Sequence, residues 1–209
     1  MNAVVAIDGP AGSGKSSVAH ALADALGYSL LDTGAMYRAL TVEALARGLD
    51  PSDEGALGQL ARSLDLVLAP RVLVNGHDVD DLLRSDAVNA AVSQVASHRE
   101  VRTAMVDRQR QWAARQPVGT VAEGRDTTTV VFPEATLKVY LTASLEERQR
   151  RRGDDESAES VARRDEVDAT REVAPLRAAT GACVVDTTDV AVADVVKEIM
   201  TCLATRTSS

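Results

Sequence analysis

The chain has 209 residues, of which 45% are hydrophobic and 26% charged, enough apolar material for one core or for a core domain with insertions. Its formal net charge of −8 excludes a general nucleic-acid binder, whose affinity rests on a basic surface. No apolar run approaches the ~20 residues of a membrane span, and Asp8 and Pro10 cut the first run too short for a signal peptide. We therefore expect a soluble cytoplasmic protein that binds neither membrane nor nucleic acid.

The first motif lies between an apolar run, AVVAID, and a segment with helical periodicity, SSVAHALADALG, which Gly27 should end. It comprises Gly9, Pro10, Ala11, Gly12, Ser13, Gly14, Lys15, Ser16 and Ser17. This is the spacing of a Walker A phosphate loop, in which backbone N–H groups and a lysine hold phosphates and a serine hydroxyl ligates Mg²⁺. Because strand, loop and helix follow in the required order, we interpret the motif as a nucleotide phosphate site rather than a simple turn. We expect Lys15 to be exposed to the phosphates rather than packed in a core.

Further strand and helix patterns alternate along the chain. Strands are predicted in YSLLDTG (28–34), PVGTVAEG (117–124), ATLKVYLTA (135–143) and GACVVDTTD (181–189). Helices are predicted in AMYRALTVEALARG (35–48), SLEERQRRR (144–152), VARRDEVDATREVAP (161–175) and a last amphipathic segment. This alternation predicts an α/β fold with a parallel sheet covered on both faces and ligands beyond the carboxyl ends of its strands.

The middle of the chain reads as an insertion. A helical pattern, ALGQLARSL (56–64), precedes a small hairpin in DLVLAPRVLVNGHDVDD (65–81), with its turn at Asn75 and Gly76. Residues 85–116 are strongly helical, with a break near Ser97, whose side chain could cap the second of two helices.

The ordered motifs resemble the cytidylate kinases of bacteria, a family of small P-loop nucleoside monophosphate kinases. The resemblance rests on IDGPAGSGKSS, LLDTGAMYR, NAAVSQVAS, EGRD with TVVFPEA, KVYLTAS and DATREVAPL, and it covers nearly the whole chain. It implies a P-loop kinase that uses ATP with Mg²⁺ to convert CMP or dCMP into CDP or dCDP. It also implies a core of residues 1–34, 117–150 and 172–209, a monophosphate-binding insertion at 35–116 and a lid at 151–171.

The resemblance assigns roles to particular side chains. Thr33, Tyr37 and Arg38 would lie at the monophosphate, and Arg125 would face the acceptor phosphate. Ser93, Arg102 and Asp126 would contact the cytosine ring, whose N4 amine a carboxylate can accept from and whose N3 and O2 an arginine can donate to. From sequence alone, Tyr37 and Arg38 would be an ordinary helix surface.

A second set of arginines lies near the predicted lid. Arg164, Asp168 and Arg171 fall at i, i+4 and i+7 and would share one helix face, which by spacing alone could be a solvated ion-pair surface. The family assigns these three to the ribose hydroxyls and phosphates of CMP. Arg148 and Arg152 would bind ATP, although a basic helix end facing the helix dipole is an equal alternative. Lys15, Arg125, Arg164 and Arg171 are the residues expected to neutralise charge during transfer.

Several points stay open at this stage. Ser16 is the expected Mg²⁺ ligand, with Asp32 or Glu123 as weaker candidates for a second contact. Thr127 and Thr128 replace the usual Ile-Gly of the family, and the lost glycine predicts a different turn or a displaced Asp126. Cys183 and Cys202 have no metal-ligand spacing and are expected to be unpaired, as in a reducing compartment.

We expect this kinase to be a monomer. Two other functions compete with this interpretation. The nearest is a small P-loop kinase that acts on another monophosphate or a small alcohol. A nucleotide-switched binding module would need a guanine-reading N-K-x-D element, which the sequence lacks.

Overall fold

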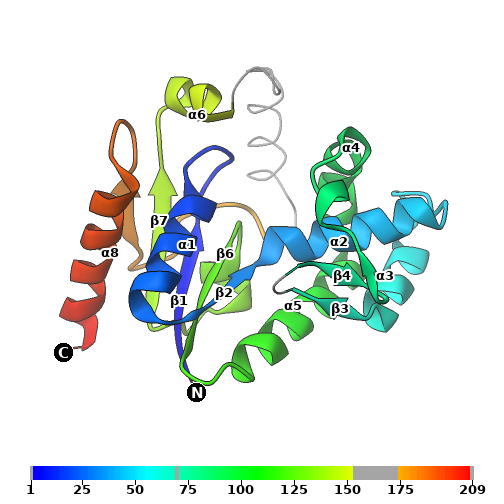
Figure 1. Ribbon diagram of the computed structural model, residues 1–209, viewed down its shortest axis with the longest axis horizontal. Helices are drawn as coiled ribbons and strands as arrows, with labels where there is room; N and C mark the ends of the chain where they lie inside the picture. Colours follow the sequence, from blue (N-terminus) through cyan, green and yellow to red (C-terminus); the bar gives the residue numbers. More distant parts are fainter. Residues whose placement is uncertain (1, 69–70, 153–173, 208–209) are drawn as a thin grey trace. The chain divides into compact units, whose positions relative to one another are not determined.

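The computed structural model describes residues 2–68, 71–152 and 174–207, in which strands and helices alternate along the chain (Figure 1). Contacts divide the chain into two compact units, Met1–Leu31 with Trp112–Ser209 and Asp32–Gln111. Each helix in the described part is too short or too polar to span a bilayer.

The first unit is built on a five-stranded sheet with the strand order β2-β6-β1-β7-β8. Its strands are β1 (Ala3–Asp8), β2 (Ser29–Asp32), β6 (Gly119–Gly124), β7 (Leu137–Thr142) and β8 (Cys183–Asp186). β1 pairs in parallel with β6 on one side and β7 on the other, and β7 pairs in parallel with β8. The α/β fold expected from the alternating sequence pattern is confirmed.

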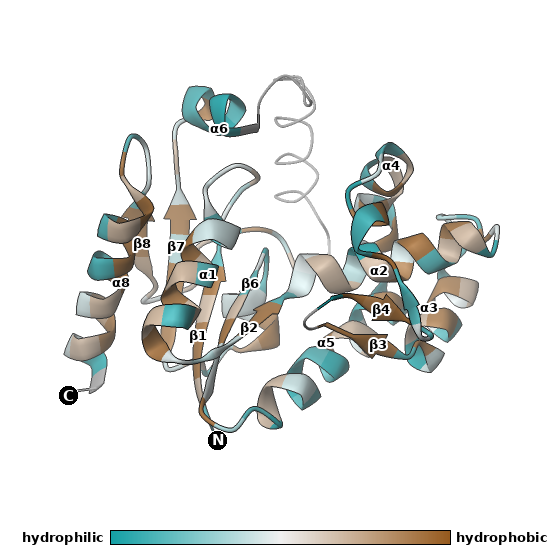
Figure 2. Ribbon diagram, in the orientation of Figure 1, coloured by the Kyte–Doolittle hydropathy of each residue, from teal (hydrophilic) through white to brown (hydrophobic). Residues whose placement is uncertain are grey.

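The core of this unit forms because β1 is central and apolar on both faces. Val5, Ala6 and Ile7, whose side chains alternate between the two faces, are fully buried, and β1 is hydrophobic over most of its length (Figure 2). Helices α1 (Lys15–Leu26) and α8 (Val192–Thr207) bury Leu22 and Ile199 in the same cluster as the strands. α1 ends at Gly27, whose φ of 64° is the left-handed conformation expected of a C-cap glycine.

Two short helices follow strands of this sheet. A single π-helical turn, η2 (Thr127–Val131), comes directly after β6 and the loop residues Arg125 and Asp126. Helix α6 (Leu145–Arg152) follows β7 and is the hydrophilic helix in Figure 2. Both begin at the carboxyl ends of strands, where an α/β sheet places its ligands.

The second unit combines helices with a small antiparallel sheet. Its helices are α2 (Thr33–Ala46), α3 (Glu54–Ser63), α4 (Asp86–Val95), most of α5 (Arg99–Ala114) and a 3₁₀ turn, η1 (Asp80–Leu82). The sheet contains β3 (Leu66–Val67), β4 (Leu73–Val74) and β5 (His77–Asp78). Asn75 and Gly76 form the turn between β4 and β5 with φ values of 50° and 81°, so the predicted hairpin turn is confirmed.

One capping prediction in this unit is wrong. α4 and α5 do separate near Ser97, but α5 begins at Arg99. The Ser97 hydroxyl donates instead to the carbonyl oxygen of Gln94 at 2.7 Å, so it satisfies the end of α4. Ser97 therefore lies in the turn just after α4 and binds the end of that helix rather than capping the second.

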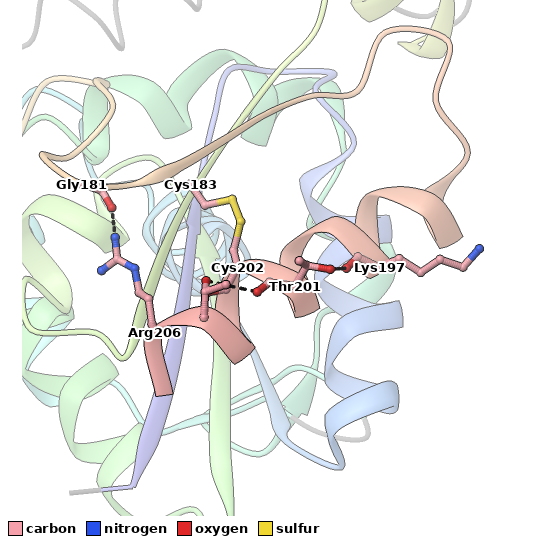
Figure 3. The surroundings of a disulfide bond; sticks show 7 residues. Gly181, Cys183, Lys197, Thr201, Cys202 and Arg206 are labelled. Atoms are coloured by element: carbon pink, nitrogen blue, oxygen red, sulfur yellow. Dashed lines mark hydrogen bonds between the residues drawn. A yellow bond between two sulfur atoms is a disulfide. The ribbon is translucent and has the colours of Figure 1, made fainter. Parts of the chain in front are cut away.

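The expectation for the two cysteines is also wrong. Cys183 on β8 and Cys202 on α8 form a disulfide, with an S–S distance of 2.20 Å and a Cα–Cα distance of 6.6 Å (Figure 3). The Arg206 side chain donates to the Gly181 carbonyl oxygen close by. Spacing in sequence could not show the pairing, because it depends on α8 packing back on β8. The cysteines thus give no support to the reducing compartment expected from sequence.

Candidate active site

The phosphate loop is shaped by two glycines in conformations that other residues rarely adopt. Gly12 and Gly14 have φ values of 77° and 82°. A Cβ on Gly9 would lie 2.3 Å from the carbonyl oxygen of Leu141, and one on Gly12 would lie 2.6 Å from that of Arg148. Neither contact is possible, so the loop requires its glycines for close backbone packing as well as for its turns.

Lys15 contradicts the expectation that its side chain is exposed. The residue is 6% exposed, and its Nζ donates to the carbonyl oxygen of Pro10 at 2.8 Å. The ammonium group therefore lies folded against its own loop, at the N-terminus of α1, where the helix dipole favours anions. A positive charge held in this way is preorganised to meet phosphate oxygens.

Ser16 and Glu123 bring two oxygen ligands together. The Ser16 hydroxyl donates to the Glu123 carboxylate oxygen Oε1 at 2.6 Å, and Glu123 is 5% exposed at the end of β6. Asp32, the other acidic candidate, accepts the Ala35 N–H at 2.9 Å as the N-cap of α2. In the described residues, no group of three or more His, Cys, Asp or Glu side chains forms a ready metal cage.

Arg125 and Asp126 stand between β6 and the π turn. Asp126 is 5% exposed, and its carbonyl oxygen accepts the Val130 N–H at 2.9 Å. Arg125 is half-buried, and its guanidinium lies 3.4 Å from the Gly124 carbonyl oxygen. The acidic and basic side chains expected to contact the acceptor are thus consecutive residues on a buried loop.

The two consecutive threonines after Asp126 both bind Asp8. Thr127 donates its N–H and hydroxyl to Asp8 Oδ1 at 2.8 and 2.7 Å, and Thr128 donates its own pair to Oδ2 at 2.8 and 2.6 Å. Thr128 is not among the residues with positive φ. The segment from Thr127 to Val131 turns as a π helix, and both threonine side chains are buried in it.

Helix α6 carries two arginines onto the phosphate loop. Arg148 donates from Nη1 to the Ala11 carbonyl oxygen at 3.2 Å. Arg151 donates to the Thr187 hydroxyl at 2.9 Å, and that hydroxyl lies 3.0 Å from the Ser13 carbonyl oxygen. Arg148, expected at ATP, is therefore beside the loop. The side chain of Arg152 lies outside the described residues.

Glu147 holds the arginines of α6 in place. Its side chain is 6% exposed and accepts from Arg150 Nε and Arg151 Nε, each at 2.7 Å. The hydrogen bond from Arg150 is the main reason that the pKa of Glu147 falls below its ordinary value, with Arg151 adding to the effect against desolvation. Glu147 therefore supports a positive surface next to the loop.

The second unit contains five of the residues expected to bind CMP. The guanidinium of Arg102 lies 5.9 Å from the centre of the Tyr37 ring, and Arg102 is 4% exposed. Arg38 donates from Nη1 to the Leu83 carbonyl oxygen at 2.9 Å and to Asn89 Oδ1 at 2.7 Å. Thr33 is buried at the start of α2, and Ser93 is half-buried on α4. Tyr37 and Arg38 are thus not the plain helix surface that their spacing alone indicates.

Part of the expected site cannot be placed. Arg164, Asp168 and Arg171 lie outside the described residues, as does most of the expected lid at 151–171.

Sequence reasoning missed three residues that hold the surroundings of the site through side-chain hydrogen bonds. Asp8 accepts from Thr127, Glu147 accepts from Arg151 of α6, and Thr187 donates to the Ser13 carbonyl oxygen of the phosphate loop. The role of Asp8 could have been predicted from sequence, because an acidic residue at the end of an apolar strand must accept hydrogen bonds when it is buried. The role of Thr187 could not have been.

Comparisons with known proteins agree on one family. The family model described as cytidylate kinase matches residues 5–205. The cytidylate kinase of Geobacillus kaustophilus is 49% identical, over 94% of this chain and 94% of that protein, and that of Azotobacter vinelandii is 45% identical, over 97% and 96%. The crystal structure of TT1252 from Thermus thermophilus has a TM-score of 0.52 at 21% identity and covers 98% of this chain and 97% of that one, which bears on the fold alone.

Proposed function

Because the chain belongs to the cytidylate kinase family, we infer that it transfers the γ-phosphoryl group of ATP to CMP or dCMP, giving ADP and CDP or dCDP. The observation that carries this function is the family match over residues 5–205 together with a phosphate loop whose lysine is folded against it. The other functions that the sequence alone allows, a kinase for another acceptor or a nucleotide switch, have no comparable support.

We propose that the loop from Gly9 to Ser17 binds the phosphates of ATP. Its backbone N–H groups and Lys15 would supply the donors, and the dipole of α1 would add positive potential. Arg148 and Arg152 would contact ATP from α6. Arg148 already reaches the loop through the Ala11 carbonyl oxygen, which supports its placement on the donor side.

The oxygen atoms of Ser16 and Glu123 fit a magnesium ion that accompanies ATP. Mg²⁺ prefers hydroxyl, carboxylate and phosphate oxygens, and these two side chains already meet at 2.6 Å. When bound, the ion would neutralise phosphate charge and orient the phosphates. Ser16 would be its ligand, and Glu123 would hold Ser16 or contact the ion through water.

On the acceptor side, we propose that two groups of residues bind CMP. Thr33, Tyr37 and Arg38 would contact its phosphate, and Ser93 and Arg102 its cytosine ring. The support is that the Arg102 guanidinium lies over the Tyr37 ring and that both residues are buried, so an arginine that could donate to N3 and O2 is packed within this unit. The unit Asp32–Gln111 would then be the monophosphate-binding insertion, and residues 151–171 the lid.

Arg125 and Asp126 would contact different parts of the acceptor, CMP. Asp126 accepts hydrogen bonds and suits the N4 amine of cytosine, whereas Arg125 suits the phosphate that attacks. Arg164 and Arg171 would add charge at the CMP phosphate, and Asp168 would bind the ribose hydroxyls. These roles come from the family and from the chemistry of each side chain.

Phosphoryl transfer needs positioning and charge neutralisation more than covalent chemistry. The attacking CMP oxygen is already anionic, so no side chain has to act as a general base. Lys15, Arg125, Arg164 and Arg171 would stabilise the charge that spreads over the equatorial oxygens of the transferring group. We further propose that the protein works as a monomer in the cytoplasm, which supplies both nucleotides.

The direct test measures ADP formation by the purified protein with ATP and Mg²⁺, and with CMP, dCMP, UMP, AMP or no acceptor. We expect slow turnover alone and strong stimulation by CMP and dCMP. Equal stimulation by AMP, or ATP hydrolysis that ignores the acceptor, would overturn the proposed function. Adding EDTA should abolish transfer, and restoring Mg²⁺ should recover it.

A further inference from the structure

We propose that Asp8, Thr127 and Thr128 form a positioning clamp that fixes the loop bearing Arg125 and Asp126 against the phosphate loop, and thereby sets both the rate and the base choice of the reaction. This inference rests on the proposed function and adds three positioning residues to it. None of the three is expected to touch substrate.

The clamp is a carboxylate saturated by two consecutive residues. Asp8 is 0% exposed, and each of its oxygens receives one backbone N–H and one hydroxyl, at distances from 2.6 to 2.8 Å. A buried carboxylate is tolerated only when its acceptor sites are filled, so these four bonds support one another. Because all four donors come from Thr127 and Thr128, the clamp holds a single short segment.

The position of the clamp in the chain gives it a functional consequence. Asp8 precedes Gly9, the first residue of the phosphate loop, and Thr127 follows Asp126. In the sheet, Asp8 of β1 lies opposite Gly124 of β6, and Gly124 directly precedes Arg125 in the sequence. The clamp therefore fixes the base-reading residues relative to the loop that holds the donor phosphates, and transfer is sensitive to small changes in that geometry.

The threonine hydroxyls are the side-chain part of the clamp. The Ile-Gly typical of the family would keep both backbone donors but remove both hydroxyls, so half of the bonds to Asp8 depend on Thr127 and Thr128. Thr127 and Thr128 are 0% and 1% exposed, which shields the bonds from competing water. A glycine at position 128 would allow backbone conformations that a threonine rarely adopts. We infer that the two hydroxyl bonds to Asp8 compensate for the loss of that freedom.

The test replaces each hydroxyl by a methyl group of similar shape, in Thr127→Val and Thr128→Val, with Thr127→Ser and Thr128→Ser to restore the hydroxyl. Thr120→Val is the matched control, because Thr120 is fully buried on β6 and its hydroxyl has no partner in the part of the chain that the structure describes. For each protein, kcat, the KM of CMP and of ATP, and the ratio of kcat/KM for CMP to that for UMP are measured, together with Tm.

Both valine variants should lower kcat and the CMP-to-UMP ratio about tenfold, because losing a hydrogen bond to a buried charge releases the loop. The KM of ATP should stay within about twofold, since the phosphate loop keeps its own Lys15–Pro10 bond. Serine variants should recover most of the loss, and Thr120→Val should match the wild type. Valine variants that lower Tm but leave kcat and the ratio unchanged would overturn the clamp, as would serine variants that recover nothing.

Asp8→Asn provides a stronger perturbation. Its NH₂ group cannot accept hydrogen bonds, so it would point at one N–H and one hydroxyl that both need an acceptor. If that variant does not fold, the threonine variants still decide the question. A wild-type protein whose ATP turnover CMP does not stimulate would count against the proposed function instead, so the two failures are distinguishable.

Discussion

Lys15 illustrates how a buried charge can be kept available for catalysis. The residue is 6% exposed, and its ammonium group donates to the Pro10 carbonyl oxygen. The ammonium group lies beside the loop at the N-terminus of α1, in a place with little water, so its attraction for an incoming phosphate is strong at short range.

The first prediction concerns this lysine. Lys15→Ala should lower kcat by about 100-fold or more, because it removes a charge that stabilises the transition state. The far-ultraviolet circular dichroism spectrum should be unchanged, since the methylene chain contributes little to the core. Lys138→Ala, which removes another of the three lysines, is the control. Turnover close to that of the wild type in Lys15→Ala would contradict the phosphate-loop assignment.

The second prediction concerns Asp126 and the choice of base. A carboxylate accepts from the N4 amine of cytosine but repels the O4 of uracil, so the wild type should prefer CMP to UMP. Asp126→Asn can present an amide donor, and it should lower activity on CMP while narrowing the CMP-to-UMP ratio of kcat/KM by about tenfold or more. The two ratios are measured side by side. A constant ratio with reduced activity would mean that Asp126 supports its loop without reading the base.

Among the elements, α6 depends on a short ion-pair network. Glu147 accepts from Arg150 and Arg151 within the helix, and Arg151 continues to Thr187 on the segment after β8. The lowered pKa of Glu147 means that the folded state releases its proton more readily than the unfolded chain does. The network therefore stabilises the fold above the unfolded pKa and is lost as the pH falls through the folded value.

This gives a third prediction, on pH. The urea midpoint of the wild type should fall as the pH drops from about 5 to about 3, and Glu147→Gln should show a shallower fall because it has no proton to gain. At neutral pH the variant should be the less stable protein. Glu146→Gln, at the neighbouring exposed position, serves as the control. Identical pH profiles for wild type and Glu147→Gln would show that the network contributes nothing to stability.

The disulfide joins β8 to α8, and the fourth prediction follows from the length of chain that it closes. Cys183 and Cys202 are 19 residues apart, which corresponds to about 3 kcal/mol through restriction of the unfolded chain. Reduction of the wild type should lower the free energy of unfolding by this amount. Cys183→Ser, Cys202→Ser and the double variant should behave alike, and reductant should not affect any of them. Titration of two free thiols in the untreated protein would contradict the pairing.

These elements also explain what could be predicted from sequence. The strands, the phosphate loop and the Asn75-Gly76 turn follow from local periodicity and from glycine conformations, which neighbouring residues determine. The errors at Ser97 and at the cysteines concern which partner a side chain finds. The Asp8 carboxylate and Thr127 are 119 positions apart, and no local pattern encodes such a contact. The same holds for Arg102 stacked on Tyr37.

At the scale of the whole molecule, the net negative charge opposes the binding of anionic substrates, so local contacts must provide the attraction. The protein carries a net charge of −8, and both proposed substrates are anions, so long-range attraction does not favour binding. Three lysines leave twenty of the 23 basic residues as arginine. Arginine binds phosphates through a planar pair of donors, which gives strong local contacts that do not depend on net charge.

The fifth prediction tests whether arginines between residues 160 and 175 serve the acceptor. Arg164→Ala and Arg171→Ala should each raise the KM of CMP about tenfold or more, because each removes a charged hydrogen-bond donor. The KM of ATP should change by less than about twofold, since both residues are assigned to CMP and not to the donor. The family alone gives this assignment, which makes the measurement informative.

Arg163→Ala is the matched control, because Arg163 adjoins Arg164 and carries the same charge but lies outside the i, i+4, i+7 set. If the effect came from net charge, all three variants would weaken CMP and ATP alike, and raising the salt concentration would reduce the differences among them. A selective loss for CMP in Arg164→Ala and Arg171→Ala, with Arg163→Ala unchanged, requires specific contacts. An equal rise in KM for the two nucleotides, or no rise, would mean that this segment is the solvated ion-pair surface that its spacing alone suggests.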